Sequence, residues 1–410
     1  MRRMSWSRDV CISGDFGNAE SSASGARVAS IADGLLEHGY RVTSIGMASF
    51  VIAEDSQHDA RSKAVRVEIQ PTASSATGPV VMIRRDRTGI STAGPLILLM
   101  QNLAFVAAFL SAVDQWCREH RGGTLVLYGR RGEALLPCVL SARLRRCKVV
   151  LDVTEWFGRS AAPSFASWLS IVLAQRVVPR LVDHATLIVE EAASQLPRSL
   201  PVTHASAMAP RRVTQRAMRA SPRETTSRAE HEFTCVFSGS EGGGLASVIA
   251  ALGRLSRNHP HVRFILRTTR SGTVTLPPEN SGRVEVVDEG ALSQDDYLLL
   301  LESADCLIVP GTRGTDKDYA FPNRLPEYLL SGRPTIVSGY PAVGRMIRHR
   351  EHALLLETDD VQELTRAIES VLLHPSQMDE MAKRGRSHAL AVFSPARVME
   401  PVAEVLRWGS

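Results

Sequence analysis

Cysteines are few in this sequence, and none is spaced for metal binding or for thiol redox chemistry. There is no C-x-x-C pair, and His184, His204 and the other histidines show no ligand spacing. Scattered cysteines of this kind are typical of reduced core thiols in a cytosolic protein. We therefore expect a cytoplasmic protein without a metal site. The six cysteines stand at positions 11, 117, 138, 147, 235 and 306.

Three short motifs that would assign a chemistry are also missing. The sequence has no G-x-G-x-x-G fingerprint, no Walker sequence and no serine-centred nucleophile elbow. The first absence argues against a nicotinamide enzyme, and the others leave no sign of a P-loop enzyme or an α/β-hydrolase. The net charge of the chain does not identify the class of its binding partner either. A net charge of +5 with a pI near 9.0 fits nucleotides, nucleic acid or an anionic membrane surface.

A clear membrane-spanning run is lacking as well. The N-terminus is basic but leads into no apolar segment, so it does not predict a signal peptide. Residues 95–113 approach the ~20 apolar residues that cross a bilayer. However, Gln101 and Asn102 interrupt this run, and Asp114 and Arg118 continue it into polar sequence. We interpret it as a buried or interfacial helix, which leaves association with the inner face of a membrane open.

What the sequence does contain is a regular alternation of strands and helices. An apolar run ends in Gly14, a helical pattern covers residues 26–38, and a strand begins after Gly39. This β-α-β unit implies a parallel sheet. Further strands are expected at residues 65–69, 80–83, 124–128, 148–152 and 185–189.

The alternation stops and then restarts in the second half. Residues 211–230 are polar, rich in arginine and without apolar periodicity, so we expect a linker there. Strands and helices alternate again from residue 233, which predicts a second α/β sheet. Because 410 residues exceed what one core usually serves, two domains are predicted.

The most informative stretch is residues 321–338, FPNRLPEYLLSGRPTIVS. Asn323 is suited to cap a helix with Pro326 in its first turn. Glu327 would lie near the helix start, stabilised by the helix dipole, where a carboxylate can accept the two hydroxyl groups of a ribose. Arg324 could neutralise a diphosphate. Charge and spacing alone also leave open a helix start that makes only local ion pairs.

This stretch resembles the donor-site signature of GT-B glycosyltransferases, in particular the retaining family 4, which reads roughly P-x-K/R-x-x-E-Y-x-x-x-G-x-P-V. Residues 292–310 and 344–357 are similar to neighbouring segments of that family. The similarity covers most of residues 231–408. It is weaker in the first half, where it rests on the loop at 14–25, the order of the elements and residues 152–156.

The resemblance implies a GT-B fold, with two Rossmann-like, doubly wound α/β domains facing across a cleft. Its parts would be an acceptor domain (1–205), a linker (206–230), a nucleotide-sugar donor domain (231–392) and a final helix crossing back (393–410). It implies transfer from a nucleotide-diphosphate sugar to a glycan, lipid-linked or small-molecule acceptor, as in polysaccharide biosynthesis. Retained configuration, no metal or other cofactor, and no nucleic-acid partner are also implied. In that family the position of Glu327 holds the donor ribose.

One departure from the family pattern concerns the sugar. Many members carry a second glutamate eight positions before the ribose one, and here that position is Tyr319. Its neighbour Asp318 is the candidate to contact the sugar or take part in catalysis. Together with Asp316 it forms a D-x-D triplet, for which a metal site and a solvated turn also stay open.

A second departure concerns the diphosphate. The family usually offers an arginine and a lysine after the first strand of the donor domain, and this chain has three glycines there instead. Backbone N–H groups of such a loop can cradle phosphate. The candidates for this role are Gly239, Gly242 and Gly243, with Arg313, Lys317 and Arg324 to supply positive charge.

The first half offers candidates at two strand ends. Gly14, Gly17 and Gly25 surround the loop after the first strand, where small residues let the backbone approach a ligand, and the resemblance places that loop near the donor. Asp152 and Glu155 follow the 148–152 strand. We expect one of the two to orient the acceptor hydroxyl, while a helix cap or surface ion pair stays open.

Two alternative functions and one question of membrane contact remain at this point. The departures allow a catalytically inactive GT-B-like scaffold subunit of a glycan-assembly complex, and a nucleotide-sugar epimerase shares the architecture. Arg143, Arg145 and Arg146 could touch an anionic membrane or a lipid-linked diphosphate, although a solvated helix face accounts for them better.

Overall fold

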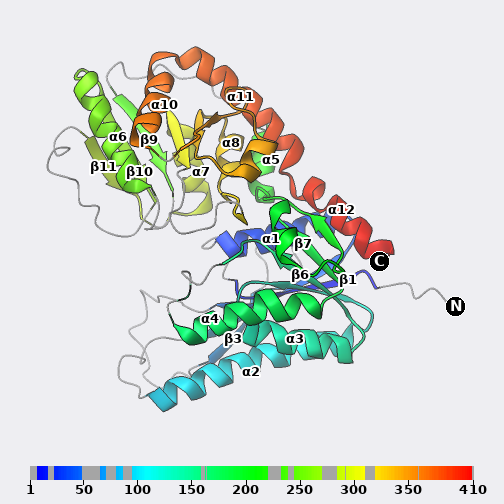
Figure 1. Ribbon diagram of the computed structural model, residues 1–410. Helices are drawn as coiled ribbons and strands as arrows, with labels where there is room; N and C mark the ends of the chain where they lie inside the picture. The colour runs from blue at the N-terminus through cyan, green and yellow to red at the C-terminus, as the bar shows by residue number, and fades with distance from the viewer. Residues whose placement is uncertain are drawn as a thin grey trace. The chain divides into compact units, whose positions relative to one another are not determined.

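The computed structural model divides the chain into two compact units. One consists of Met1–Ser206 together with Pro395–Ser410, and the other of Ala207–Ser394. Each is an α/β unit with its own sheet (Figure 1). The residues that the structure describes are 7–16, 23–48, 65–70, 80–85, 95–157, 162, 164–219, 232–238, 244–269, 284–290, 292–309, 319–358 and 360–408.

The strands of the first unit are β1 (Asp9–Gly14), β2 (Arg41–Ala48), β3 (Val65–Gln70), β4 (Val80–Arg85), β5 (Thr124–Tyr128), β6 (Lys148–Val153), β7 (His184–Leu187) and β8 (Val202–His204). Its α-helices are α1 (Ala23–Glu37), α2 (Pro95–Glu119), α3 (Gly132–Leu144), α4 (Phe165–Val172) and α12 (Pro395–Trp408). Short π- and 3₁₀-helical turns follow at η3 (Leu173–Val177), η4 (Val178–Arg180) and η5 (Glu190–Gln195).

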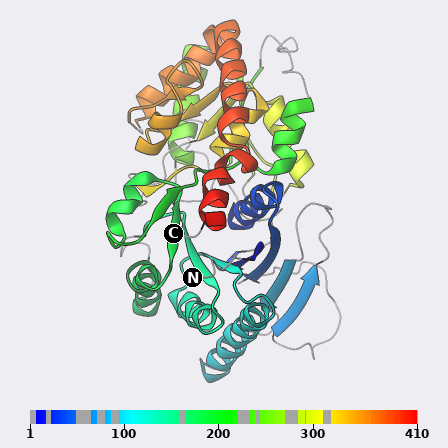
Figure 2. The same cartoon turned by 90° about the vertical axis from the view of Figure 1, so that its right-hand side faces the viewer.

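The described strands of this unit form one sheet in the order β3-β4-β2-β1-β5-β6-β7-β8. All neighbours pair in parallel except β3, which is antiparallel to β4. The order reverses at β1, whose two neighbours are β2 and β5. Helices α2, α3 and α4 cover one face, while α1 and α12 cover the other (Figures 1 and 2). The predicted doubly wound arrangement is therefore confirmed.

Helix α12 is an integral part of the first unit because it packs on α1. A Cβ added at Gly34 of α1 would lie 2.5 Å from the carbonyl oxygen of Pro395 and 2.6 Å from Cγ of Met399. The hydroxyl of Tyr40 donates to the carbonyl of Ala403 at 2.9 Å. A glycine at position 34 thus allows the two helices to approach closely.

Helix α2 contains the apolar stretch at residues 95–113 and continues to Glu119, as the sequence predicts. Phe105, Phe109, Val113 and Trp116 are buried at helical spacing, while Leu103 is exposed. The helix is therefore amphipathic and packs on the unit with one side. Over the described part of the chain, none of the helices combines the length and the apolarity needed to span a bilayer.

The strands of the second unit are β9 (Glu232–Phe237), β10 (Arg263–Thr268), β11 (Val284–Asp288), β12 (Cys306–Val309), β13 (Thr335–Val337) and β14 (Leu354–Leu355). Its helices are α5 (Arg211–Arg219), α6 (Leu245–Asn258), α7 (Gln294–Ser303), α8 (Leu325–Ser331), α9 (Pro341–Met346), α10 (Val361–Leu373) and α11 (Pro375–Val392).

The second sheet is parallel throughout its described strands, in the order β11-β10-β9-β12-β13-β14. Helices α6 and α10 pack together over a fully apolar core that includes Phe233, Phe264 and Ile368. Helix α8 packs against α5, α7 and α11. This unit too is doubly wound. All six cysteines of the chain are buried and free of disulfides, as expected for core thiols.

The linker predicted at residues 211–230 is wrong for its first part, because residues 211–219 form helix α5. Val213 and Ala217 are buried four residues apart, and Arg216 forms a bidentate ion pair with Glu302 at 2.7 and 2.9 Å. The buried Arg386 of α11 donates to the carbonyl of Ala217 at 2.6 Å. A one-sided apolar stripe of two residues is too short to recognise in arginine-rich sequence.

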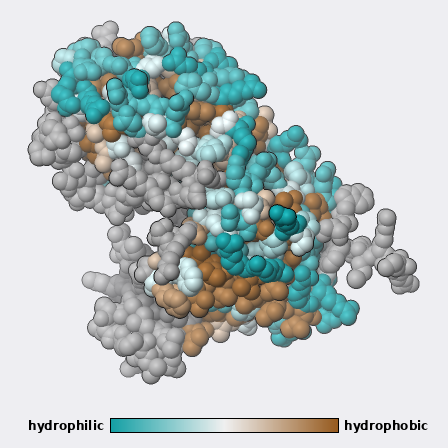
Figure 3. Space-filling model, in the orientation of Figure 1, coloured by the Kyte–Doolittle hydropathy of each residue, from teal (hydrophilic) through white to brown (hydrophobic). Residues whose placement is uncertain are grey.

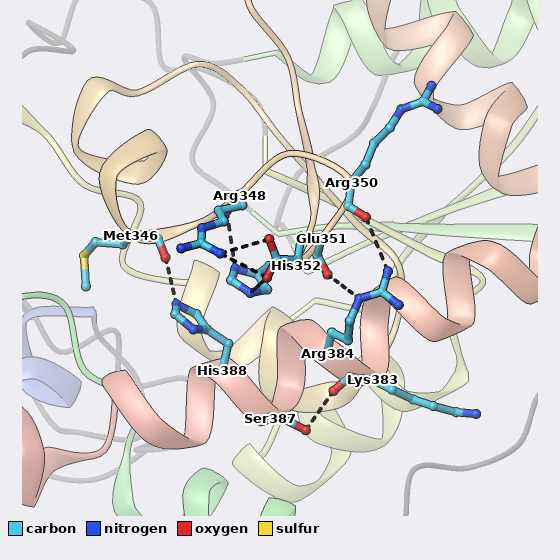
Figure 4. Close-up of polar contacts among 9 residues, drawn as sticks. All are labelled: Met346, Arg348, Arg350, Glu351, His352, Lys383, Arg384, Ser387 and His388. Atoms are coloured by element: carbon cyan, nitrogen blue, oxygen red, sulfur yellow. Dashed lines mark hydrogen bonds and ion pairs between the residues drawn. The ribbon is translucent and has the colours of Figure 1, made fainter.

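The segment before β14 is fastened to α11 by polar contacts (Figure 4). The rings of His352 and His388 stack with their centroids 4.0 Å apart. His388 contacts the carbonyl of Met346 at 2.7 Å, and Arg384 donates to the carbonyl of Glu351 at 3.2 Å. Burial, and then the proximity of His388, lower the pKa of His352. The lowered pKa favours the uncharged form of the His352 ring in this stack.

A buried ion pair lies at the centre of the first unit. Arg27 on α1 donates from Nε and Nη2 to the two carboxylate oxygens of Asp152 on β6, both at 3.0 Å, with side chains 3% and 1% exposed. Thr186 on β7 donates to the same carboxylate at 2.6 Å. Arg27 also donates to the carbonyls of Ala205 and Ser206, at 3.1 and 2.8 Å. The pair thus joins a helix, two strands and the segment with which the chain leaves the unit.

Replacing Arg27 by methionine should destabilise the protein, because it leaves the carboxylate of Asp152 buried without its counter-charge. Removing one partner of a buried pair costs about 3–5 kcal/mol, and we expect a loss of that size in the free energy of unfolding in urea. The double variant Arg27→Met/Asp152→Leu should lose less than the single one, since no unpaired charge remains. A loss below about 1 kcal/mol for Arg27→Met, the range of exposed pairs, would contradict this assignment.

Candidate functional site

The carboxyl edge of the second sheet carries the strongest candidate site. The strand order reverses between β9 and β12, and in open parallel sheets ligands bind beyond the strand ends at such a reversal. Ser238 directly follows β9, and α8 is the first described helix after β12. The predicted residues Arg324 and Glu327 therefore lie at the place where the fold itself favours a ligand.

Arg324 is held by side chains from two other segments. Its Nη1 donates to the hydroxyl of Ser238 and, at 3.1 Å, to the hydroxyl of Tyr297 on α7. Its guanidinium carbon lies 5.4 Å from the centre of the Tyr297 ring, a cation–π contact. Against the effect of burial, Tyr297, Tyr328 and Glu327 raise the pKa of Arg324. The site therefore holds a fixed positive charge.

Glu327 lies one helical turn beyond Arg324 and is partly buried. Burial raises the pKa of Glu327, while Arg324 and the hydroxyl of Tyr297 act in the opposite direction. A carboxylate with a raised pKa on a ligand-binding edge is a functional-site candidate. This group can accept two hydrogen bonds from a ligand that carries adjacent hydroxyl groups.

Two tyrosines that the sequence did not suggest complete this arrangement. The hydroxyl of the fully buried Tyr328 accepts a hydrogen bond from the backbone N–H of Ser238 at 3.0 Å, which fixes the end of β9 against α8. Tyr297 supports Arg324 from α7. Tyr328 follows Glu327 in the sequence motif, so a signal existed for it. For Tyr297 we find none beyond its place in an apolar helix.

Asn323 does not cap helix α8. The helix begins at Leu325, and its N-cap residue is Arg324, whose side chain makes no capping hydrogen bond. The backbone of Arg324 is already helical, with φ −84° and ψ −14°, because its carbonyl accepts the N–H of Tyr328 at 3.0 Å. Asn323 instead lies in the turn before the helix.

Several predicted positions lie outside the described residues, namely Gly17, Gly239, Gly242, Gly243, Arg313, Lys317 and Asp318. Their roles stay predictions. Tyr319, which replaces the second glutamate of the family pattern, is partly buried at the first described position before α8. Within the described ranges, no three His, Cys, Asp or Glu side chains are grouped so as to hold a metal ion.

The carboxyl edge of the first sheet has its own reversal, between β1 and β5. Gly14 ends β1, and a Cβ added there would lie 1.8 Å from the carbonyl oxygen of Tyr128 on β5. The close approach of β5 therefore requires a glycine at position 14, so this glycine is not evidence for a ligand. Gly25, expected in the loop, lies inside α1, which begins at Ala23.

Asp152 and Glu155, the two acidic candidates of this edge, have different surroundings. Both oxygens of Asp152 accept hydrogen bonds from Arg27 or Thr186, and the residue is buried. Glu155 is partly exposed beyond the strand end, and burial raises its pKa against the effect of Arg130. Asp152 is thus suited to positioning neighbours, and Glu155 to meeting a ligand.

A comparison with protein families finds a match within the second unit. Residues 234–374 match the family described as Glycosyl transferases group 1. This range contains most of β9, the whole of α8 and the site around Glu327. No curated protein matches the chain by sequence.

Solved structures resemble the chain over nearly its whole length. Alr3699/HepE of Anabaena, determined in complex with UDP, is 13% identical with a TM-score of 0.62, covering 97% of this chain and 99% of that one. Sucrose-phosphate synthase of Thermosynechococcus elongatus is 14% identical with a TM-score of 0.65, covering 97% and 98%. A UDP-forming α,α-trehalose-phosphate synthase of Burkholderia vietnamiensis is 12% identical with a TM-score of 0.63, covering 100% and 98%.

At these identities the structural likeness establishes the fold. The two parallel-sheet units match GT-B glycosyltransferases, and the predicted GT-B fold is confirmed. Together with the domain match over residues 234–374, the fold supports a glycosyltransferase enzyme.

Proposed function

We propose that the protein transfers a sugar from a UDP-sugar to a hydroxyl group of a glycan, lipid-linked or small-molecule acceptor. The observation that carries the proposal is that Glu327 and Arg324 lie together at the strand reversal of the second sheet, inside the matched domain. The choice of uridine is supported by HepE of Anabaena, which was solved with UDP and with UDP-glucose.

Each of these two side chains has a defined task in this proposal. Glu327 accepts hydrogen bonds from the ribose hydroxyl groups, which a carboxylate does better than a neutral oxygen. Arg324 brings a positive charge to the same edge, where it favours the negative charge that develops on the departing diphosphate. Tyr297 and Ser238 keep the guanidinium in place, so little reorganisation is needed during the reaction.

On the acceptor side we assign the orienting role to Glu155. The alternative, Asp152, already directs both carboxylate oxygens at Arg27 and Thr186. A carboxylate whose pKa is raised by burial can accept a hydrogen bond or a proton from an acceptor hydroxyl near neutral pH. Cation–π contacts hold the residues beside it: Arg176 lies 5.5 Å from the Trp156 ring and Arg130 lies 5.3 Å from the Phe157 ring.

The stereochemistry and metal requirement follow from the resemblance of residues 321–338 to the retaining family 4. We propose transfer with retention of the anomeric configuration and without an essential metal ion. Product analysis by NMR should give the same anomeric configuration as the donor, and activity should persist in EDTA. An inverted product, or activity that only a divalent metal restores, would contradict this part of the proposal.

Glu327→Ala should weaken UDP binding about tenfold to a hundredfold, as expected for the loss of a charge-assisted hydrogen bond. Isothermal titration calorimetry measures the change directly. The wild-type protein should also bind 2′-deoxy-UDP more weakly than UDP, and this difference should shrink in the variant. The shrinkage identifies the ribose as the partner of Glu327.

Glu380→Ala provides the matched control, because Glu380 lies in the same unit, exposed and beside Lys383. It should bind UDP like the wild-type protein. If Glu327→Ala and the wild-type protein bind UDP with equal affinity, the donor site proposed here is wrong. Normal UDP binding without any transfer or donor hydrolysis would instead favour the scaffold alternative, to which the replacement of the second glutamate by Tyr319 also points.

Glu327→Gln should stabilise the protein at neutral pH even though it weakens UDP binding. Burial raises the folded-state pKa of Glu327 above its unfolded value, so the folded wild type binds the proton more tightly and loses stability as the pH rises through that pKa. The uncharged amide avoids this loss. The difference in unfolding free energy should therefore be largest near pH 7 and vanish towards the ordinary glutamate pKa of about 4.3.

Urea unfolding of both proteins across this pH range measures the difference. Glu380→Gln should show no stabilisation at neutral pH, because Lys383 and then Arg384 lower the pKa of Glu380. A Glu327→Gln variant that is less stable than wild type at every pH would contradict this prediction. It would mean that the charged carboxylate stabilises the fold.

A further inference from the structure

Helix α3 is apolar on both of its sides. The inward side buries Ala134, Leu135, Cys138, Val139 and Ala142. The outward side carries Leu140 and Leu144, which are 53% and 80% exposed, with the partly exposed Leu136 and Pro137 before them. Leucines that are this exposed next to one another on a helix are typical of a surface that another body covers. Within the first unit, nothing described covers this outward stripe.

Helix α4 continues the same surface. Phe165 and Leu169 are 71% and 44% exposed, and Ile171 is the single buried residue of the helix. Trp168 and Val172 are partly exposed, so apolar residues recur at outward-facing helical spacing, and the Phe165 and Trp168 rings lie 5.5 Å apart. Helices α3 and α4 are in contact, and Figure 3 shows apolar side chains gathered over this part of the unit.

Exposed arginines accompany these helices. Arg143 and Arg146 lie at the end of α3, and Arg176 and Arg180 lie in the turns that follow α4. Arg143 pairs with Asp183 at 2.8 Å and remains 48% exposed. The sequence from 143 to 146 contains three arginines and no acidic residue. The apolar stripes therefore occur together with positive charge.

We propose that the outward faces of α3 and α4, with these arginines, form a docking surface for an anionic lipid bilayer. Interfacial helices place aromatic and leucine side chains at the level of the lipid headgroups while arginines meet the anionic headgroups. A protein partner would account for the exposed leucines, but it would not call for the exposed Arg146, Arg176 and Arg180 beside them. The proposal goes beyond sugar transfer and does not depend on it.

Vesicle sedimentation with the full chain tests the proposal. The protein should sediment with vesicles of phosphatidylcholine containing about one third phosphatidylglycerol and much less with phosphatidylcholine alone, because each arginine near an anionic surface contributes about 1 kcal/mol. Raising the salt from about 0.1 M to about 0.5 M should release it, since screening shortens the range of the attraction.

The double variant Leu144→Glu/Phe165→Glu should lower the partition coefficient by at least about tenfold, because two apolar side chains no longer leave water. Arg146→Ser/Arg180→Ser should lower it on anionic vesicles only. The matched control is Leu299→Glu/Leu373→Glu, which changes two exposed leucines of the second unit, 47% and 55% exposed. It should sediment like the wild type, and circular dichroism with urea unfolding of all variants verifies that they are folded.

Two results would overturn the proposal. One is a wild-type protein that stays in solution with anionic vesicles, or a Leu144→Glu/Phe165→Glu variant that still binds them. The other is analytical ultracentrifugation showing a wild-type oligomer that this variant converts to monomers. In that case the surface joins copies of the chain.

Discussion

The ion pair between Arg27 and Asp152 is the interaction on which the first unit depends most directly. A single guanidinium contacts a strand-end carboxylate and two carbonyls of the segment that leaves the unit. Because both side chains are almost fully removed from water, the desolvation penalty is offset only while all these bonds are made together. The interaction therefore selects one arrangement of α1, β6 and β7 and disfavours looser ones.

The carboxylates at the carboxyl edges of the two sheets, Asp152 and Glu327, have opposite surroundings. In the first, Asp152 is neutralised by a bidentate arginine and becomes part of the framework. In the second, Arg324 directs Nη1 towards hydroxyl groups, and burial raises the pKa of Glu327. A carboxylate that the fold does not fully satisfy is the one that gains most from a ligand. This contrast separates the framework residue from the candidate binding residue more clearly than sequence position does.

Much of the fold followed from local pattern. Strand and helix alternation predicted both sheets, and the motif around Glu327 predicted the helix that became α8. The partnership of Arg27 with Asp152 was not predictable, since 125 residues separate the two. The same holds for Tyr297 and Arg324, which meet only after two helices have packed. Helix α5 was missed because its stability comes from contacts with Glu302 and Arg386 rather than from its own periodicity.

The placement of α12 bears on how the chain is synthesised. Residues 1–206 emerge first from the ribosome, yet the helix that covers α1 is encoded at 395–408. Until α12 has been synthesised, the hydroxyl of Tyr40 lacks its acceptor on Ala403. The side of α1 around Gly34, which α12 will cover, is exposed to water. The second unit, which is continuous in sequence, is complete before the first. The nascent protein thus has to protect an apolar helix face through most of translation, which makes the early unit a natural client for chaperones.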